Sequence, residues 1–223
     1  MVEFPSGREQ VPGYLSAPEG KGPFPGLILI HEWWGLNDQI KGVADRLAKE
    51  GYAVLAVDLY RGRSTADPEV AHQYMAGLPD DRATRDILAA FSHLQQQSDI
   101  RKDRIGSIGF CMGGKFSAQL AVNEPKLAAG VIFYGSVPTD PATLQKIQAP
   151  VIGFFGQNDK AITPDMANSF EQEMKKLGKN VSVTIYPGAG HAFMNQTGKS
   201  YNEAAAKDAW PKMLQFLQKH LKS

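Results

Sequence analysis

The single cysteine of the chain, Cys111, lies at the centre of a Gly-x-Cys-x-Gly pentapeptide that could carry a nucleophile. Its spacing is that of the G-x-S-x-G elbow, in which small residues two before and two after the nucleophile let a strand turn sharply into a helix. Residues 104–109 favour a strand, and residues 115–122 (KFSAQLAV) have apolar side chains at helical spacing. The pentapeptide alone also fits an ordinary turn with a buried thiol, but these flanking segments favour a nucleophile at the edge of a sheet.

Asp159 and His191 could complete a catalytic triad with Cys111. Each follows an apolar run of strand length, 151–155 and 181–186 respectively, and ligands of open α/β sheets bind outside the carboxyl ends of the strands. A free thiol has a reference pKa of about 8.5, so a neighbouring imidazole is needed to raise its thiolate fraction, and a carboxylate orients that imidazole. The order nucleophile, acid, histidine is that of the α/β-hydrolases. Taken singly, Asp159 also fits a turn or cap residue, and His191 a solvated loop residue.

Strands and helices that would position these residues alternate along the chain. Continuous apolar runs, typical of parallel strands covered on both faces, occupy 26–31, 52–58, 128–135, 149–156 and 181–188. Helical spacing of apolar residues is found at 37–49, 68–76, 80–97, 142–146, 164–177 and 201–221. The segment up to residue 17 favours an antiparallel edge strand or hairpin. This order predicts an α/β fold with a mostly parallel sheet, helices on both faces and no large cap domain.

Length and composition fit one globular domain spanning residues 1–223, since 43% of the residues are hydrophobic and 21% are charged. The formal net charge is +1 and neither sign forms a long block. This gives no electrostatic reason to expect nucleic acid or an anionic membrane as a partner, and it favours a small, roughly neutral ligand.

The N-terminus lacks a basic segment followed by an apolar one, and no apolar run is long enough to span a bilayer. We therefore expect a soluble, cytoplasmic protein. One cysteine excludes an intramolecular disulfide, and neither a CxxC nor a His-x-x-x-His pattern indicates a metal site. We expect no cofactor, and a monomer or a weak dimer.

Six short motifs, spread over nearly the whole chain, resemble those of one known family. They are HEWWG at 31–35, VDLYRGR at 57–63, GFCMGG at 109–114, FYG at 133–135, GQND at 156–159 and GAGHAF at 188–193. The family is that of the dienelactone hydrolases (carboxymethylenebutenolidases), which have the α/β-hydrolase fold. A cysteine in the elbow together with a glutamate in the first strand-end loop is more specific to this family than either feature alone, because most α/β-hydrolases have a serine and an HG dipeptide there.

The resemblance implies a role for each residue of the presumed triad. Cys111 would be the nucleophile, His191 the general base and then the general acid, and Asp159 the partner that orients the histidine. In this family the glutamate that matches Glu32 contacts the resting thiol. Taken alone, Glu32 also fits a surface loop carboxylate.

The resemblance also implies an oxyanion hole formed by the backbone N–H groups of Trp33 and Met112. The residues themselves support Met112, because it follows the nucleophile at a helix N-terminus, where unpaired N–H groups can face a developing oxyanion. The side chains of Trp33 and Trp34 fit the wall of an acyl pocket and ordinary packing equally well.

Residues in or beside these motifs are expected to contact the substrate: Trp34, Tyr60, Arg61, Tyr134 and Phe193. The chain also departs from the family pattern, in which arginines hold the carboxylate of the lactone. One of them would stand four residues after the histidine, where this chain has Asn195, and the other has no clear counterpart in 66–78. The nearest guanidinium groups in the sequence are those of Arg61, Arg63, Arg82 and Arg85.

We therefore predict a cysteine-dependent hydrolase of a small lactone or activated ester, acting through a thioester acyl-enzyme. A general carboxylesterase or thioesterase acting on small activated esters is the alternative, which the missing arginines favour. A redox-responsive thiol and a binding protein are further alternatives, although neither requires the ordered Asp159 and His191.

Overall fold

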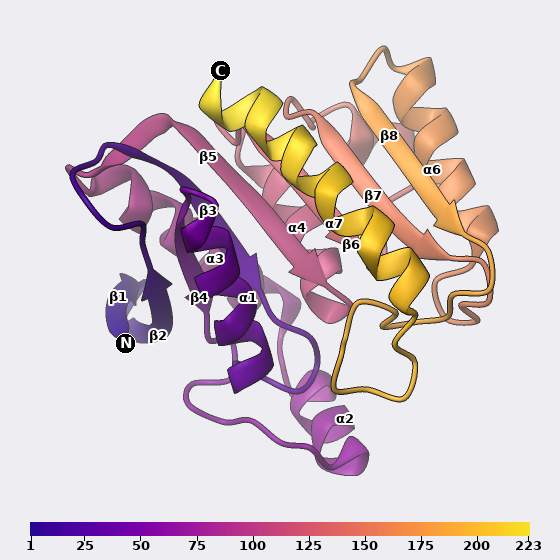
Figure 1. Cartoon of the computed structure of the whole chain (residues 1–223), viewed down its shortest axis with the longest axis horizontal. Helices are drawn as coiled ribbons and strands as arrows, with labels where there is room; N and C mark the ends of the chain where they lie inside the picture. Colours follow the sequence, from indigo (N-terminus) through magenta and orange to yellow (C-terminus); the bar gives the residue numbers. More distant parts are fainter.

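Continuous apolar segments form the strands of one eight-stranded sheet, the framework of the computed structural model, which describes residues 1–223 (Figure 1). The strands are β1 (Val2–Ser6), β2 (Glu9–Ser16), β3 (Phe24–Ile30), β4 (Ala53–Val57), β5 (Ile100–Phe110), β6 (Ala129–Phe133), β7 (Val151–Gly156) and β8 (Val181–Tyr186). Their order in the sheet is β1-β2-β4-β3-β5-β6-β7-β8. Strands β3 to β8 run parallel to one another, whereas β2 runs antiparallel to both of its neighbours, β1 and β4. The predicted, mostly parallel sheet is confirmed.

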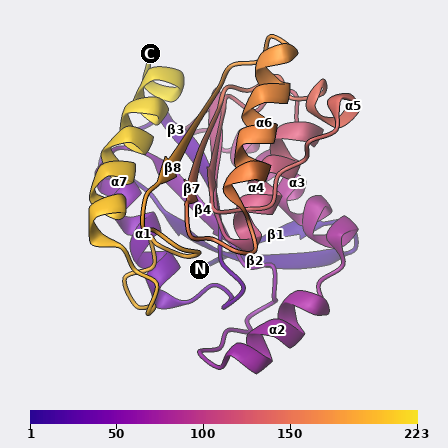
Figure 2. The ribbon, with the colours of Figure 1, turned by 90° about the vertical axis from the view of Figure 1, so that its right-hand side faces the viewer.

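Helices cover both faces of this sheet, as Figure 2 shows. One face carries α1 (Asp38–Lys49) and α7 (Glu203–Leu217), and the other carries α3 (Asp80–Gln96), α4 (Met112–Asn123) and α6 (Pro164–Lys176). Each face has its own buried apolar cluster, because successive side chains of a strand point to opposite faces. Two short helices complete the fold, α2 (Pro68–Ala76) and α5 (Pro141–Leu144). None of these helices combines the length and the apolar composition that crossing a lipid bilayer requires.

Two element boundaries differ by four residues from those that the sequence predicts. Strand β5 begins at Ile100 rather than at residue 104, because Ile100 pairs with Phe24 at the start of β3. The charged residues 101–104 conceal this early part of the strand in the sequence. Helix α7 ends at Leu217, and the chain continues as one π-helical turn, Gln218–Lys222, instead of a single helix to residue 221.

A buried carboxylate joins the N-terminal hairpin to the rest of the fold. Asp86 of α3 is completely buried and accepts a hydrogen bond from the hydroxyl of Ser6 at 2.6 Å. Its other oxygen lies 2.7 Å from the guanidinium of Arg61, which also contacts Glu9 at 3.0 Å. Strand β1, helix α3 and the segment after β4 thus meet at one ion pair.

The parallel strands all end at the same edge of the sheet, and the loops that follow them bring distant parts of the chain together (Figure 1). Residues 31–37 follow β3, Cys111 follows β5, and Asp159 lies in the loop after β7. A long loop, 187–202, joins β8 to α7 and passes the end of β5 (Figure 1). Cys111, Asp159 and His191 therefore all lie in segments at this one edge.

Candidate active site

Cys111 lies at a strained turn between β5 and α4. Its backbone has φ 55° and ψ −118°, a conformation that residues other than glycine rarely adopt. The neighbouring glycines make the turn possible: a Cβ at Gly109 would lie 1.9 Å from the carbonyl oxygen of Gly113, and one at Gly113 would lie 2.2 Å from that of Ile30. Backbone atoms cannot move aside as a flexible side chain can, so both positions require glycine. The structure therefore has the elbow that the sequence predicts.

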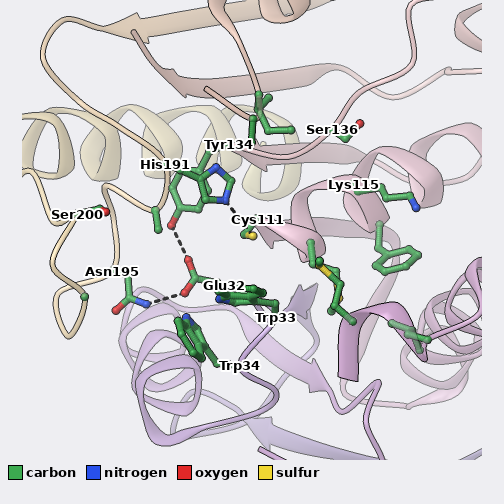
Figure 3. Close-up of a pocket in the computed structure, with 18 of the residues that line it drawn as sticks. Glu32, Trp33, Trp34, Cys111, Lys115, Tyr134, Ser136, His191, Asn195 and Ser200 are labelled. Carbon is green, nitrogen blue, oxygen red and sulfur yellow. Dashed lines mark hydrogen bonds between the residues drawn. The ribbon is translucent and has the colours of Figure 1, made fainter. Parts of the chain in front are cut away.

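His191 lies within hydrogen-bonding reach of both Cys111 and Asp159, and Figure 3 shows its contact with Cys111. The distance from His191 Nε2 to Cys111 Sγ is 3.0 Å, and that from His191 Nδ1 to Asp159 Oδ2 is 2.7 Å. An ionised carboxylate can only accept hydrogen bonds, so Nδ1 donates to Asp159 and Nε2 faces the thiol. The N–H groups of Ala161 and Ile162 donate to the other oxygen of Asp159, each at 2.9 Å. The carboxylate is thus held in place on both sides.

The environment of the pair shifts the pKa values of both partners. Burial works against ionisation of Asp159, but hydrogen bonds from His191 and from the backbone outweigh it and lower the pKa of this carboxyl. Burial likewise works against protonation of His191, yet its contacts with Asp159 and Cys111 raise the pKa of the imidazole to about 10. The imidazole therefore binds a proton strongly, which a group that removes the proton of a thiol has to do.

Two backbone N–H groups beside Cys111 have no acceptor within the chain. Neither the N–H of Trp33, in the loop after β3, nor that of Met112, the first residue of α4, donates a hydrogen bond. Trp33, Met112 and Cys111 all line the same cavity. Free N–H groups in such a place can stabilise an oxyanion that forms on a bound carbonyl group.

Glu32 is buried, and its hydrogen bonds go to other partners than the thiol, with which the resemblance implied a contact. One oxygen of its carboxylate accepts a hydrogen bond from the hydroxyl of Tyr134 at 3.1 Å, and the other accepts one from Nδ2 of Asn195 at 2.6 Å (Figure 3). The sulfur of Cys111 is paired with His191 instead. Burial raises the pKa of Glu32, although the hydrogen bonds from Asn195 and Tyr134 lower it in part.

Asn195 belongs to the site, at the position where the resemblance to the family implies an arginine. It lies in the same loop as His191, and its Oδ1 accepts hydrogen bonds from the N–H and the hydroxyl of Thr197. Its amide therefore ties the loop to Glu32, a residue 163 positions earlier. In the sequence, only its place four residues after His191 marks Asn195 as a residue of the site.

A cavity of about 690 Å³ opens beside the triad. Its wall is mainly apolar and comes from several loops and helices: Trp33, Trp34, Met75, Leu78, Met112, Phe116, Ala161, Ile162 and Ala192. Polar side chains lie between them, among them Ser136, Lys199, Ser200 and the ion pair of Lys115 and Asp80, whose Nζ and Oδ2 atoms are 2.5 Å apart. Helix α2 contributes Met75, so it covers part of the cavity. A small organic molecule fits this volume and this mixture of surfaces.

Of the residues expected to contact the substrate, Trp34 and Tyr134 line the cavity, whereas Tyr60, Arg61 and Phe193 do not. Tyr60 is fully buried and its hydroxyl donates to the sulfur of Met112 at 3.2 Å. Arg61 is held by Asp86, away from the triad. Phe193 is buried beside the ring of Tyr134, with centroids 5.2 Å apart. We therefore withdraw the prediction of substrate contact for Tyr60, Arg61 and Phe193.

The chain is similar over its whole length to proteins of one family. The profile of the dienelactone hydrolase family matches residues 11–221. A Synechocystis protein provisionally named carboxymethylenebutenolidase is 34% identical, with 100% of this chain and 97% of the relative covered. A Bradyrhizobium protein provisionally named 2-oxo-3-(5-oxofuran-2-ylidene)propanoate lactonase is 32% identical, with 99% and 94% covered.

Among solved structures, the dienelactone hydrolase-like promiscuous phosphotriesterase P91 from metagenomic libraries superimposes with a TM-score of 0.89. It is 26% identical, and 98% of this chain and 96% of that chain are covered. The likeness therefore extends from the motifs to the arrangement of the whole sheet and its helices. This chain belongs to the dienelactone hydrolase family and has its α/β-hydrolase fold.

Proposed function

We propose that this protein hydrolyses small lactones or activated esters, with Cys111 as the nucleophile and a thioester acyl-enzyme as the intermediate. The observation that carries the proposal is the hydrogen-bonded series from Asp159 through His191 to the sulfur of Cys111, at 2.7 and 3.0 Å, beside a mainly apolar cavity. The family and the lactonase name of one relative support the substrate class.

The first half of the reaction forms the acyl-enzyme. His191 takes the proton of the thiol, and the sulfur of Cys111 attacks the carbonyl carbon of the bound substrate. The carbonyl oxygen becomes an oxyanion, to which the free N–H groups of Trp33 and Met112 donate. His191 then gives its proton to the departing oxygen as the C–O bond breaks, which leaves a thioester on Cys111. In a lactone, the departing hydroxyl stays attached to the acyl group.

Water completes the cycle by the same steps. His191 removes a proton from a water molecule, whose oxygen attacks the thioester carbonyl. The C–S bond breaks, the carboxylic acid is released, and the sulfur regains the proton. Asp159 accepts the hydrogen bond of Nδ1 throughout, so it stabilises the imidazolium that forms in each half.

The charges around the cavity favour substrates without a carboxylate near the reacting carbonyl. Asn195 stands where the family has an arginine, and its neutral amide is engaged by Glu32. Of the two lysines in the wall, Lys115 is paired with Asp80, so Lys199 is the one lysine of the wall without a salt bridge, and it does not occupy the position of the family's arginine. This favours the second candidate, a carboxylesterase or thioesterase for small neutral activated esters, over an enzyme for an anionic dienelactone.

An activity screen across lactones, aryl esters and thioesters, each as a neutral and a carboxylated analogue, tests the proposal. We expect hydrolysis of neutral substrates with a burst of the released phenol, and a mass increase on the peptide that contains Cys111 when the reaction is quenched early. Cys111→Ala and His191→Ala should abolish both signals, because members of a triad act as a unit. Turnover near that of the wild type in either variant would refute the mechanism. Asn195→Arg should move the preference toward carboxylated substrates if the neutral amide sets it.

A further inference from the structure

His31, the first residue after β3, is fully buried, does not line the cavity, and makes two contacts with the backbone. Its Nε2 lies 3.2 Å from the N–H nitrogen of Leu59, and its Nδ1 lies 2.5 Å from the carbonyl oxygen of Glu32. A backbone N–H can only donate, so Nε2 is the acceptor and Nδ1 carries the proton, which it donates to Glu32. Burial lowers the pKa of His31, which favours the neutral ring that this arrangement needs.

The carbonyl that accepts this proton belongs to the peptide bond between Glu32 and Trp33. The single cis peptide bond of the chain lies elsewhere, so this bond is trans and its C=O and N–H point in opposite directions. A donor that holds the Glu32 oxygen therefore also fixes the direction of the Trp33 N–H, which is free beside the cavity. The N–H of Gly35 contacts the same oxygen at 3.3 Å, which leaves His31 as the closer donor.

We propose that His31 is a positioning residue for hydrolysis: by donating to the carbonyl of Glu32, it aims the N–H of Trp33 at the oxyanion. The proposal rests on the proposed function, because it places His31 behind the oxyanion hole of that reaction. His31 itself transfers no proton and touches no substrate. Its effect is to hold a donor in place before the oxyanion forms, and such preorganised donors are the source of this kind of stabilisation.

The segment after β4 also contacts Met112, whose N–H is the other free donor beside the cavity. Tyr60 follows Leu59, and its ring lies beside that of His31, with centroids 5.0 Å apart. Its hydroxyl donates to the sulfur of Met112 at 3.2 Å. Leu59 thus contacts His31, which fixes the peptide bond of the Trp33 N–H. Tyr60 contacts the side chain of Met112, whose own N–H is the other free donor. This gives Tyr60 a place in the site without contact with substrate.

Two variants of His31 separate its two hydrogen bonds. In His31→Asn, the side-chain amide can stand where Nδ1 stands, so a donor to Glu32 remains while the acceptor for Leu59 is lost. In His31→Gln, the longer side chain can keep an acceptor near the N–H of Leu59 but loses the donor to Glu32. If His31 only stabilised the fold, there would be no reason for His31→Asn to be more active than His31→Gln.

We expect His31→Gln to lower kcat/KM for an aryl ester by roughly 10- to 100-fold. A misdirected donor stabilises the oxyanion less, and removal of such a donor lowers kcat by about 100- to 1,000-fold. His31→Asn should recover most of that loss. The rate of alkylation of Cys111 by iodoacetamide should stay close to that of the wild type in both variants, because alkylation forms no oxyanion. A kcat/KM for the glutamine variant equal to or above that of the asparagine variant overturns the proposal, as does alkylation that slows in parallel with hydrolysis.

A measurement on the unaltered protein covers the case in which neither variant folds. Nitrogen-15 NMR of histidine-labelled protein at neutral pH should show His31 protonated at Nδ1 and not at Nε2, and the opposite tautomer overturns the proposal. The proposed function fails by a different result, which is ester hydrolysis that persists in Cys111→Ala. If Cys111→Ala is inactive while the two His31 variants are equally active, only the role of His31 is refuted.

Discussion

Replacing Arg61 by methionine tests whether this arginine supports the fold rather than the substrate. The substitution leaves the carboxylate of Asp86, which has no exposed surface, with the hydroxyl of Ser6 at 2.6 Å and only a distant contact to Arg85 at 4.0 Å. Removing one partner of a buried ion pair destabilises a protein by about 3–5 kcal/mol. Because the side chain of Arg61 is 21% exposed and Ser6 remains, we expect the lower end, about 3 kcal/mol.

For a chain of this size, about 3 kcal/mol corresponds to a fall in Tm of roughly 6–12 °C. Urea denaturation and a thermal scan measure both values. Lys207→Met is the matched control, since Lys207 and Glu203 form an ion pair of the same 2.7 Å length at the surface, where its loss should have no measurable effect. Adding Asp86→Asn to Arg61→Met should restore most of the lost stability, because it removes the unpaired charge while Ser6 keeps a partner.

The activity of the folded Arg61 variant decides between the two roles. Since Arg61 does not line the cavity, kcat and KM below the new Tm should equal those of the wild type. A raised KM with unchanged stability would show instead that Arg61 contacts the substrate and does not support the fold.

Three further predictions concern the site. The pKa of His191 is raised to about 10 in the fold, so the stability lost in His191→Gln should be largest below the unfolded value of about 6.5 and should vanish as the pH rises through about 10; a difference independent of pH, measured by urea denaturation, contradicts this. Glu32→Leu should destabilise the fold by about 1–3 kcal/mol because the amide of Asn195 and the hydroxyl of Tyr134 then lose their buried acceptor, whereas Glu32→Gln should cost less, since its oxygen can accept from Asn195 while its amide donates to the hydroxyl oxygen of Tyr134; an equal loss of Tm in the two variants counts against this. Gly113→Ala should prevent folding, because its Cβ would meet a backbone oxygen at 2.2 Å, whereas the control Gly42→Ala in α1, with nothing within 4 Å, should stabilise slightly, as circular dichroism and yield will show.

The sequence was sufficient for the sheet and for the proximity of the triad residues, because both follow from local signals. Apolar runs mark the strands, and the ends of parallel strands meet at one edge, so a cysteine, an aspartate and a histidine at strand ends had to lie close together. The elbow was equally predictable, since the two glycines that allow it stand in the pentapeptide itself.

What the sequence could not supply is the choice of partner among residues far apart in the chain. Glu32 is bound by Asn195 and Tyr134 instead of the thiol, and no local pattern records those pairings. Arg61 lies within a family motif, yet its partner Asp86 is buried in a helix whose periodicity shows only apolar positions. Phe193 stands two residues after His191, but its side chain is buried against Tyr134 and does not face the cavity. Its aromatic character alone does not predict which way the side chain points.

The strained elbow also determines which residues of the site can be studied by substitution. The positive φ of Cys111 belongs to the backbone, and any side chain without β-branching meets nearly the same conformational cost there. Alanine and serine at position 111 therefore leave the geometry of the turn largely intact, and their kinetics report on the chemistry of sulfur alone. At positions 109 and 113 the opposite holds, because the space for a side chain is already filled by carbonyl groups. Position 111 is thus the exchangeable part of this turn, and the fold constrains the glycines around it far more than the side chain at its apex.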